Sequence, residues 1–264
     1  MCLAVIAYNT HPKYRLIIAS NRDEFYSRAS TPMHFWEDAP HILAGRDMQD
    51  KGTWFGITTG GKLALITNVR DPASMRSDSP SRGEIVKRYL MQDLSPEAYL
   101  EELLSQGKDF NGFNLIFGTV GKLYYYSNHP EHWQEIRSGI HGLSNASLNS
   151  PWPKVDYAKE HMRGLTQNKE HIQDSSLFSI LFNDTTHPLE KLPDTGVGPG
   201  LEKMLSPVFI YSSNYGTRSS SVLKVDYNNQ VTLTEKTFDR QEDGDTYQKR
   251  TENRANSFSF RIDS

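Results

Sequence analysis

The chain has 264 residues, enough for one large domain or two small ones with a buried core, and one domain over residues 1–264 is the simpler interpretation. A formal net charge of -3 supplies no basic field, which argues against sequence-independent binding to nucleic acid or to an anionic membrane. No apolar run approaches the roughly 20 residues that span a bilayer, and the amino terminus lacks the basic start of a secretory signal. The only cysteine, Cys2, excludes an internal disulfide and favours a reducing compartment, so we expect a soluble cytoplasmic protein.

The predicted elements alternate between antiparallel strands and helices. Residues 2–8 and 14–20 are rich in Val, Ile, Leu and Ala and predict two adjacent strands joined by a short turn. Gly60-Gly61 can adopt positive φ and predicts a tight hairpin between strands at 54–59 and 62–68. Further along, the pattern predicts helices at 82–91, 96–107, 153–164 (closed by Gly164) and 176–182, and strands at 114–119, 123–127, 208–213, 220–226 and 231–238.

The carboxyl-terminal stretch differs in composition from the rest of the chain. From about 240 to 256 it is charged and nearly free of aliphatic residues. We therefore expect residues 240–264 to form either a polar strap held by a few contacts or a solvated tail. The hairpins and helix blocks before it favour layered α+β packing over a single parallel sheet.

Cys2 is the first candidate for chemistry. Removal of Met1 would leave one residue with both a thiol and a free α-amine, whose ordinary pKa is about 7.7 to 8.0. The amine can accept the thiol proton, and the thiolate can then attack an acyl carbon. The alternative is that Cys2 is a buried strand residue that serves as a small hydrophobic side chain.

A charged run, Asn21-Arg22-Asp23-Glu24, follows the second predicted strand. Arg22 can stabilise a thiolate on the neighbouring strand, and Asp23 can hold the α-amine by a charge-assisted hydrogen bond. The alternative is a turn at the strand end with an internal ion pair. Adjacent residues of an extended strand point to opposite faces, so both side chains reach one site only if the strand bends or bulges.

Three later polar residues, Asn68, Asn145 and Arg218, lie at or near predicted strand ends. Amide N–H groups stabilise negative charge on a tetrahedral oxygen without titrating, so the two asparagines are candidates for an oxyanion hole. Each residue alone is typical of a turn, and their weight comes from occurring as a set.

Other signals are weaker. None of the nine histidines forms a His-x-x-x-His pair, and with one cysteine we expect no metal site. The aromatic pairs Phe35-Trp36 and Trp54-Phe55 can line an apolar pocket, although core packing is the default for such residues.

Several motifs occur together in a fixed order: Met1-Cys2, Ala19-Ser20-Asn21-Arg22-Asp23-Glu24-Phe25, Gly52-Thr53-Trp54-Phe55-Gly56, Leu65-Ile66-Thr67-Asn68 and Tyr215-Gly216-Thr217-Arg218-Ser219-Ser220. In these motifs the chain resembles the family named for its NRDE motif, also called the Transport and Golgi organisation family. The resemblance extends over almost the whole chain. It implies an N-terminal-nucleophile (Ntn) hydrolase-like fold, which is a four-layer αββα sandwich.

More distantly, the order of polar residues resembles the penicillin V acylase and bile-salt hydrolase family. That family uses an N-terminal Cys, an early Arg and Asp, one or two Asn and a late Arg. The acylases separate the early Arg and Asp by two residues, whereas Arg22 and Asp23 adjoin here, so we expect one of the pair to be structural. The resemblance implies the catalytic set Cys2, Arg22, Asp23, Asn68, Asn145 and Arg218.

Three functions stay open at this stage. The first is hydrolysis of an amide or thioester of a small acylated compound through an acyl-enzyme on Cys2, a reaction that requires no cofactor. The second, implied by the family resemblance, is a non-catalytic intracellular carrier of haem, or of lipid or acyl-CoA, although the chain has no Cys-x-x-Cys-His attachment motif. The third is a scaffold in secretory-pathway organisation, which only the family's name suggests.

Overall fold

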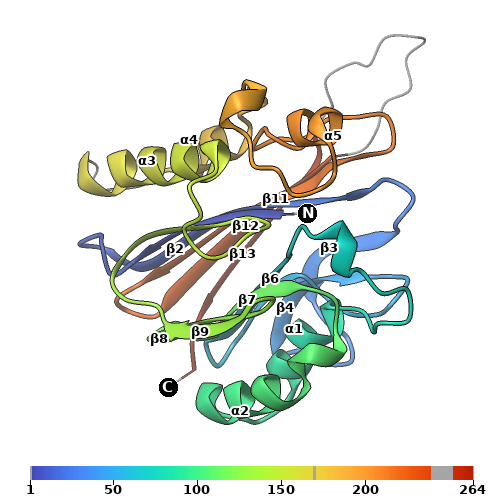
Figure 1. Cartoon of the computed structure of the whole chain (residues 1–264). Helices are drawn as coiled ribbons and strands as arrows, with labels where there is room; N and C mark the ends of the chain where they lie inside the picture. Colours follow the sequence, from blue (N-terminus) through green and yellow to red (C-terminus); the bar gives the residue numbers. More distant parts are fainter. Residues whose placement is uncertain (1, 169–170, 239–251, 264) are drawn as a thin grey trace.

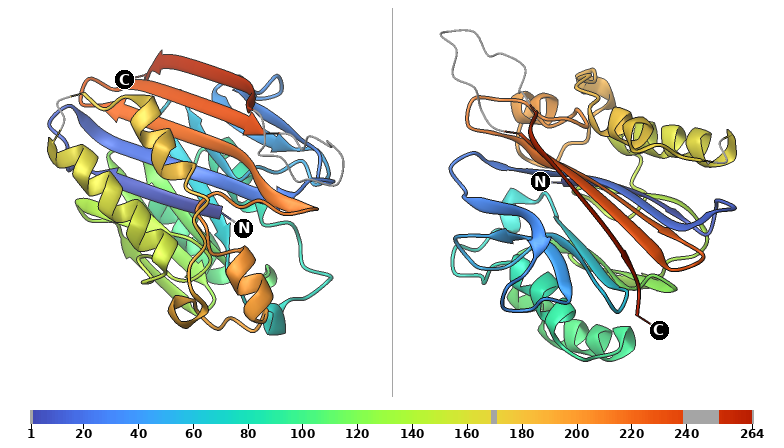
Figure 2. Two further views of the ribbon diagram at one scale, coloured as in Figure 1. Left: turned by 90° about the horizontal axis from the view of Figure 1, so that it is seen from above. Right: turned by 180° about the vertical axis from the view of Figure 1, so that it is seen from behind.

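Two antiparallel sheets stack face to face in the computed structural model, which describes residues 2–168, 171–238 and 252–263. Helices cover the outer face of each sheet, so the layers run α, β, β, α (Figures 1 and 2). The predicted four-layer αββα sandwich is therefore confirmed. The described helices are α1 (Gly83–Met91), α2 (Pro96–Gln106), α3 (Pro153–Asn168), α4 (Asp174–Leu181) and α5 (Pro199–Met204), with short 3-10 turns η1 (Pro72–Ser74), η2 (Gly107–Asp109) and η3 (Leu189–Lys191).

Every described strand pairs antiparallel to its neighbours. The first sheet has the order β10 (Gly139–Leu143), β1 (Cys2–Tyr8), β2 (Tyr14–Phe25), β11 (Tyr215–Asp226), β12 (Gln230–Phe238), β13 (Glu252–Arg261). The second has the order β3 (Ser30–Phe35), β4 (Ile42–Asp47), β5 (Phe55–Thr58), β6 (Lys62–Asn68), β7 (Phe113–Thr119), β8 (Lys122–Asn128), β9 (Glu131–Glu135). Strand β1 thus lies in the interior of the first sheet, between β10 and β2.

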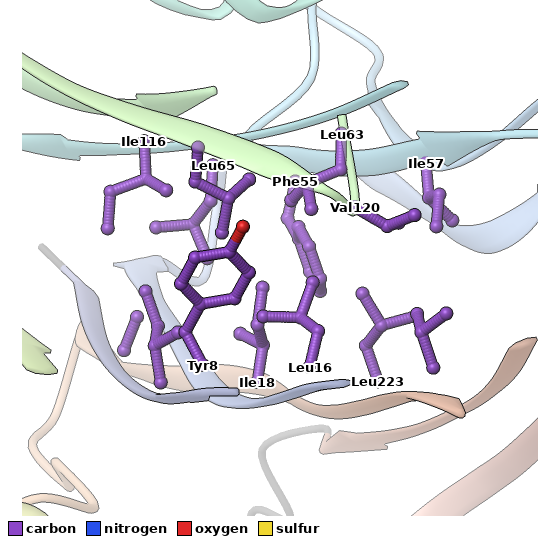
Figure 3. Packing of buried hydrophobic residues seen from close by; sticks show 14 of the residues in the cluster. Tyr8, Leu16, Ile18, Phe55, Ile57, Leu63, Leu65, Ile116, Val120 and Leu223 are labelled. Atoms are coloured by element: carbon purple, nitrogen blue, oxygen red, sulfur yellow. The ribbon is translucent and has the colours of Figure 1, made fainter. Parts of the chain in front are cut away.

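The central core fills the space between the two sheets (Figure 3). On β1, Ala4, Ile6 and Tyr8 face this space, whereas the intervening apolar residues face the helical layer. Leu16 and Ile18 of β2 join the same intersheet core. Because both faces of these strands are buried, their sequences are almost continuously apolar, and burial of each large aliphatic side chain contributes about 1.5–3 kcal/mol.

Each helical layer has its own core. Tyr89 of α1 and Tyr99 of α2 pack with Phe117 of β7, with ring centroids 5.0 to 5.8 Å apart. On the other side of the molecule, Met162 of α3 and Phe178 of α4 pack onto the outer face of β1 and β2. These contacts fix the two sheets between rigid layers.

Most predicted hairpins and helices are confirmed, with two corrections. Gly164 does not close α3, which continues to Asn168, because this glycine does not adopt the positive φ that ends a helix. Residues 208–213 are not a strand. Val208 is buried in the core beneath the helices and Ile210 in a small cluster with Leu205 and Tyr215, and Tyr211 makes only an isolated bridge to Gly216.

Part of the carboxyl-terminal segment, predicted to be a polar strap or a solvated tail, is instead a strand of the first sheet. The part of the expected strap or tail from 240 to 251 lies outside the described residues, while β13 pairs along the whole length of β12. Phe258 and Phe260 of β13 pack edge-on against Phe35 of β3, with centroids 6.1 and 5.8 Å apart. This end of the chain therefore closes one side of the intersheet core.

Candidate active site

Cys2 is the first residue of β1 and lies at one end of the space between the two sheets. In the β1–β2 register it is opposite Arg22, and both follow the alternation that directs even-numbered residues of these strands into the intersheet core. Asp23 and Asn21 take the other face, where the Asn21 amide donates to the carbonyl of Leu181 (2.9 Å) in the helical layer. β2 runs without interruption through Asn21-Arg22-Asp23-Glu24, so the side chains of Arg22 and Asp23 occupy opposite faces of the sheet.

The thiol lines a cavity of about 200 Å³. The cavity is bounded by both sheets and by the loop that enters α1, and its wall includes Arg22, Trp54, Asn68 and Arg82. A nucleophile, guanidinium groups and an amide therefore meet in one small, partly polar space. Of the two aromatic pairs considered from the sequence, only Trp54 reaches this wall, while Trp36 and Phe55 are core residues.

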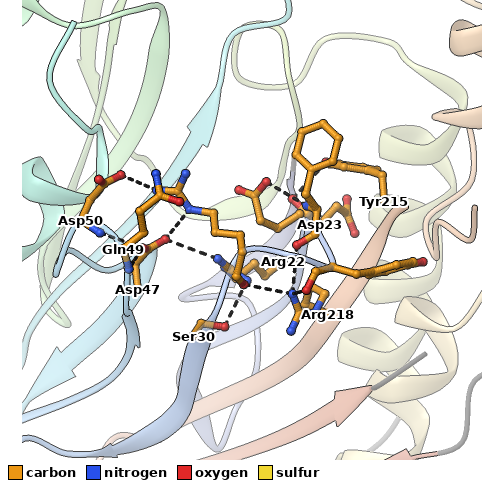
Figure 4. A network of polar contacts seen from close by, with 12 residues as sticks. Arg22, Asp23, Ser30, Asp47, Gln49, Asp50, Tyr215 and Arg218 are labelled. Atoms are coloured by element: carbon orange, nitrogen blue, oxygen red, sulfur yellow. Dashed lines mark hydrogen bonds and ion pairs between the residues drawn. The ribbon is translucent and has the colours of Figure 1, made fainter. Parts of the chain in front are cut away.

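Arg22 is held by contacts from the second sheet (Figure 4). Its guanidinium stacks 4.1 Å from the Trp54 ring, lies 3.7 Å from the Asp47 carboxylate and contacts the Ser30 hydroxyl at 3.4 Å. Burial lowers the pKa of Arg22, but a guanidinium stays charged at any working pH. Arg22 thus presents a fixed positive charge beside the thiol.

Opposing influences act on the Cys2 thiol. Burial is the largest and raises its pKa, and the negative charge of Asp23 acts in the same direction. A hydrogen bond from the Asp23 backbone and the positive charge of Arg22 lower the pKa. Because burial dominates, the thiol pKa lies above its ordinary value, and the site needs a base close to the sulfur to form a thiolate.

Asp23 sits beneath Cys2 on the helical side of the sheet. Its Oδ1 accepts a hydrogen bond from the Thr217 hydroxyl (2.7 Å), and its backbone carbonyl accepts one from the Tyr215 hydroxyl (3.0 Å). Burial raises the pKa of the Asp23 carboxyl, while the charge of Lys154 and the bond from Thr217 oppose that rise. A buried carboxylate with these partners suits the holding of a cationic amine.

A buried group of charges around Asp23 was missed by the sequence reasoning. Lys154, in the first turn of α3, is 2% exposed and donates to the Leu205 carbonyl (2.9 Å), and burial lowers its pKa to about 8. Arg70 bonds to the Glu202 carboxylate at 2.6 Å. A lysine on an amphipathic helix is ordinarily exposed, so the local sequence does not predict that Lys154 is buried. No local pattern indicated a role for Arg70 either, although it lies only two residues after Asn68.

The two asparagines are brought together beside Cys2. Asn145 Nδ2 donates to the backbone carbonyl of Asn68 (2.9 Å), and its Oδ1 accepts from the Ser144 hydroxyl (3.2 Å). The single hydrogen of that hydroxyl is shared with the carbonyl of Cys2, which lies 3.1 Å from Ser144 Oγ. Asn68 lines the cavity itself, whereas Asn145 fixes the positions of Asn68 and of the strand that carries the thiol.

Arg218 occupies a bulge in β11. Thr217 pairs with Asp23 and Ser219 with Arg22, so the extra residue keeps both cross-strand pairs on their proper faces. The Arg218 Nη1 donates to the carbonyls of Phe25, Tyr26 and Arg28 at 3.0 to 3.2 Å. It lines a neighbouring cavity of about 370 Å³, not the one that holds the thiol.

The described residues contain no group of three or more His, Cys, Asp or Glu placed to hold a metal ion. Within the same ranges, none of the helices combines the length and apolarity that a membrane span requires.

Comparison with known proteins places the chain in a family. Residues 1–240 match the model described as Transport and Golgi organisation 2. The chain belongs to the Transport and Golgi organisation 2 family. Relatives in this family include the Transport and Golgi organization protein 2 homolog of Homo sapiens, 34% identical over 258 residues, which are 90% of this chain and 93% of the relative. The Drosophila melanogaster Transport and Golgi organization protein 2 is 27% identical over 264 residues, covering 90% and 92%.

A solved structure with the same architecture is the mutant C2A conjugated bile acid hydrolase from Clostridium perfringens. It superposes with a TM-score of 0.53 at 11% identity, covering 98% of this chain and 92% of that one. At this identity the similarity concerns the fold alone. It confirms that this family member has the Ntn-hydrolase-like fold that the sequence motifs predicted.

Proposed function

We propose that the protein, once Met1 is removed, is an N-terminal cysteine hydrolase that cleaves the amide or thioester bond of a small acylated compound. The observation that carries the proposal is the placement of Cys2 at the first position of β1, opposite Arg22 and on the wall of a cavity. Only the first residue of a processed chain combines a nucleophile with a free amine. A cysteine elsewhere in this strand would have neither the amine nor the cavity.

In the proposed reaction the neutral α-amine of Cys2 takes the proton of its own thiol, directly or through water. The sulfur attacks the acyl carbon, and the proton passes to the leaving amine or thiol as its bond to carbon breaks. Water then attacks the acyl-enzyme, the α-amine accepts its proton, and the carbon–sulfur bond breaks. The free acid leaves and the thiol is restored.

The surrounding residues have separate parts in this scheme. Arg22 stabilises the thiolate, and Asp23 orients the α-amine from the opposite face of the strand. Both charged residues therefore act, one on each side of Cys2, without a bend in β2. Asn68 is the amide assigned to the oxyanion, and Asn145 is a positioning residue. Arg218 supports the loop after β2 and is placed outside the reaction.

Carriage of haem, or of lipid or acyl-CoA, is the competing function. A carrier is expected to enclose much of its ligand, and ligand pockets of that kind hold about 300–1,000 Å³. The cavity at Cys2, at about 200 Å³, is smaller than this, whereas the neighbouring cavity, which shares Arg22 and Trp54 with it, holds about 370 Å³ but does not include Cys2. The small space at the thiol itself therefore favours reaction at a short acyl group. The proposed chemistry also requires a free thiol, so we place the protein in a reducing compartment such as the cytoplasm.

The experiment is a screen of acyl anilides and acyl thioesters with three proteins: the processed chain, Cys2→Ala, and a form with a lysine inserted between Met1 and Cys2. The insertion blocks removal of Met1 and keeps the thiol, but it leaves Cys2 without a free amine. Only the processed chain should release aniline or thiol. Equal activity in the insertion form would show that the α-amine is not the base, and a visible haem band lost in Cys2→Ala would favour the carrier.

A further inference from the structure

Arg82 is a positive charge in the cavity that the reaction scheme does not use. It precedes α1, and its guanidinium lines the cavity together with Cys2. Its Nη1 donates to the backbone carbonyl of Gly112 at 3.1 Å. Within the described part of the chain, no carboxylate lies within 4.0 Å of this guanidinium.

The positive charges of the other two arginines on the cavity wall each have a carboxylate close by. Arg28 forms ion pairs with Asp47 and Asp50, and Arg22 lies 3.7 Å from Asp47. Asp23 and Glu24 are the remaining acids on the wall. Glu24 Oε1 accepts the backbone N–H of the next residue at 2.9 Å, and its charge acts to raise the pKa of Arg82 without an ion pair between the two. Arg82 therefore has the only guanidinium on this wall, among the described residues, without an ion pair.

The backbone that carries Arg82 is anchored. Thr53 donates its N–H to the Gly83 carbonyl at 3.1 Å, and the Gly52 backbone approaches so closely that a Cβ there would lie 2.5 Å from the Gly83 carbonyl carbon. This contact joins the start of α1 to the segment that leads into Trp54, which also lines the cavity. The backbone next to Arg82 is thus anchored to this wall, and its guanidinium is bonded to the Gly112 carbonyl.

We propose that Arg82 binds a carboxylate on the compound whose acyl bond Cys2 attacks, so that the substrate is an acyl compound with an acidic group close to the scissile bond. A guanidinium has the planar geometry that a carboxylate fits, and the weakly screened cavity strengthens the pairing. The cleavage step rests on the function proposed above. Recognition of the anion does not, because it depends on Arg82 alone.

The first test compares alkylation of Cys2 by iodoacetate and by iodoacetamide, which have similar size and differ in charge. Both react with the thiolate, so the ionised fraction cancels in the ratio of their rate constants. At about 0.01 M ionic strength we expect Arg82→Gln to lower the iodoacetate-to-iodoacetamide ratio by roughly threefold to tenfold. Arg82→Lys should keep most of the ratio, and Arg88→Gln, on the far side of the same helix, should leave it unchanged.

The second test needs no thiol chemistry and so separates this inference from the hydrolase proposal. In the Cys2→Ala protein, N-acetylalanine should raise the thermal midpoint more than N-acetylalaninamide does, and Arg82→Gln should abolish the difference. A Cys2 inert to both reagents, with this selectivity intact, would defeat the hydrolase and leave the anion site standing. An unchanged alkylation ratio in Arg82→Gln, or no preference for the acid over the amide, would overturn the inference.

Discussion

The buried carboxyl of Glu235 should make the free energy of unfolding depend on pH, and this dependence tests the fold. It lies on β12, is 1% exposed and lines the cavity of about 370 Å³ beside Arg22. Its Oε2 accepts the Met33 N–H at 2.7 Å, whereas Oε1 is buried without a hydrogen-bond partner among the described residues. Burial is the main cause that raises its pKa from 4.5 to about 7.

The sign of the effect follows from proton binding. Between pH 4.5 and 7 the folded protein keeps a proton on Glu235 that the unfolded chain has released, so the free energy of unfolding falls as the pH rises through this range. Each pKa unit corresponds to about 1.36 kcal/mol, which makes the total about 3 kcal/mol as an upper value. Glu235→Gln cannot ionise, and its amide oxygen can still accept the Met33 N–H.

We therefore expect Glu235→Gln to match the unsubstituted protein at pH 5 and to be more stable by up to about 3 kcal/mol at pH 8. Urea unfolding followed by tryptophan fluorescence at both pH values measures the difference. Glu101→Gln, which changes an exposed glutamate on α2, is the matched control and should alter neither value. Parallel pH dependence for Glu235→Gln and the unsubstituted protein would refute the reasoning.

Two further substitutions test the supports of the site. Thr217→Val removes the donor to Asp23 Oδ1 and should cost about 1–3 kcal/mol of stability in urea unfolding. In the processed protein it should also slow Cys2 alkylation, because Asp23 would hold the α-amine less firmly, and an unchanged rate would show that the amine does not depend on this hydrogen bond. Gly52→Ala places a methyl group 2.5 Å from the Gly83 carbonyl carbon and should destabilise the protein by about 1–3 kcal/mol. Gly60→Ala, where the nearest atom is 3.8 Å away, should be milder.

Strand pairing and the alternation of side chains along a strand depend on local pattern, and both could be predicted from the sequence. Two apolar runs separated by a short turn predict an antiparallel pair, and that pairing places Arg22 opposite Cys2. Alternation along a strand also predicts that Arg22 and Asp23 separate to opposite faces. What strand alternation does not predict is which groups the second sheet and the helical layer bring to the two faces beside Cys2.

The features that were missed depend on long-range packing. Residues 252–261 form β13 although the preceding stretch is strongly charged, and the alternation of Phe258 and Phe260 with serine was the local signal available. In the segment 208–213, Val208 and Ile210 are buried without strand pairing, and a short apolar run in the sequence cannot distinguish the two situations. Burial of Lys154 follows only from the docking of α3 on β1, which no pattern within the helix encodes.

The central claim is that Cys2 becomes an activated N-terminal nucleophile. The most direct measurement is the intact mass of protein from a methionine-processing host, before and after brief exposure to limiting iodoacetamide, with Cys2→Ala as the blank. Cys2 is the only thiol, so a single label identifies it. We expect loss of Met1 and rapid addition of one carbamidomethyl group. Retention of Met1, or a processed chain whose thiol stays unlabelled, would contradict the account.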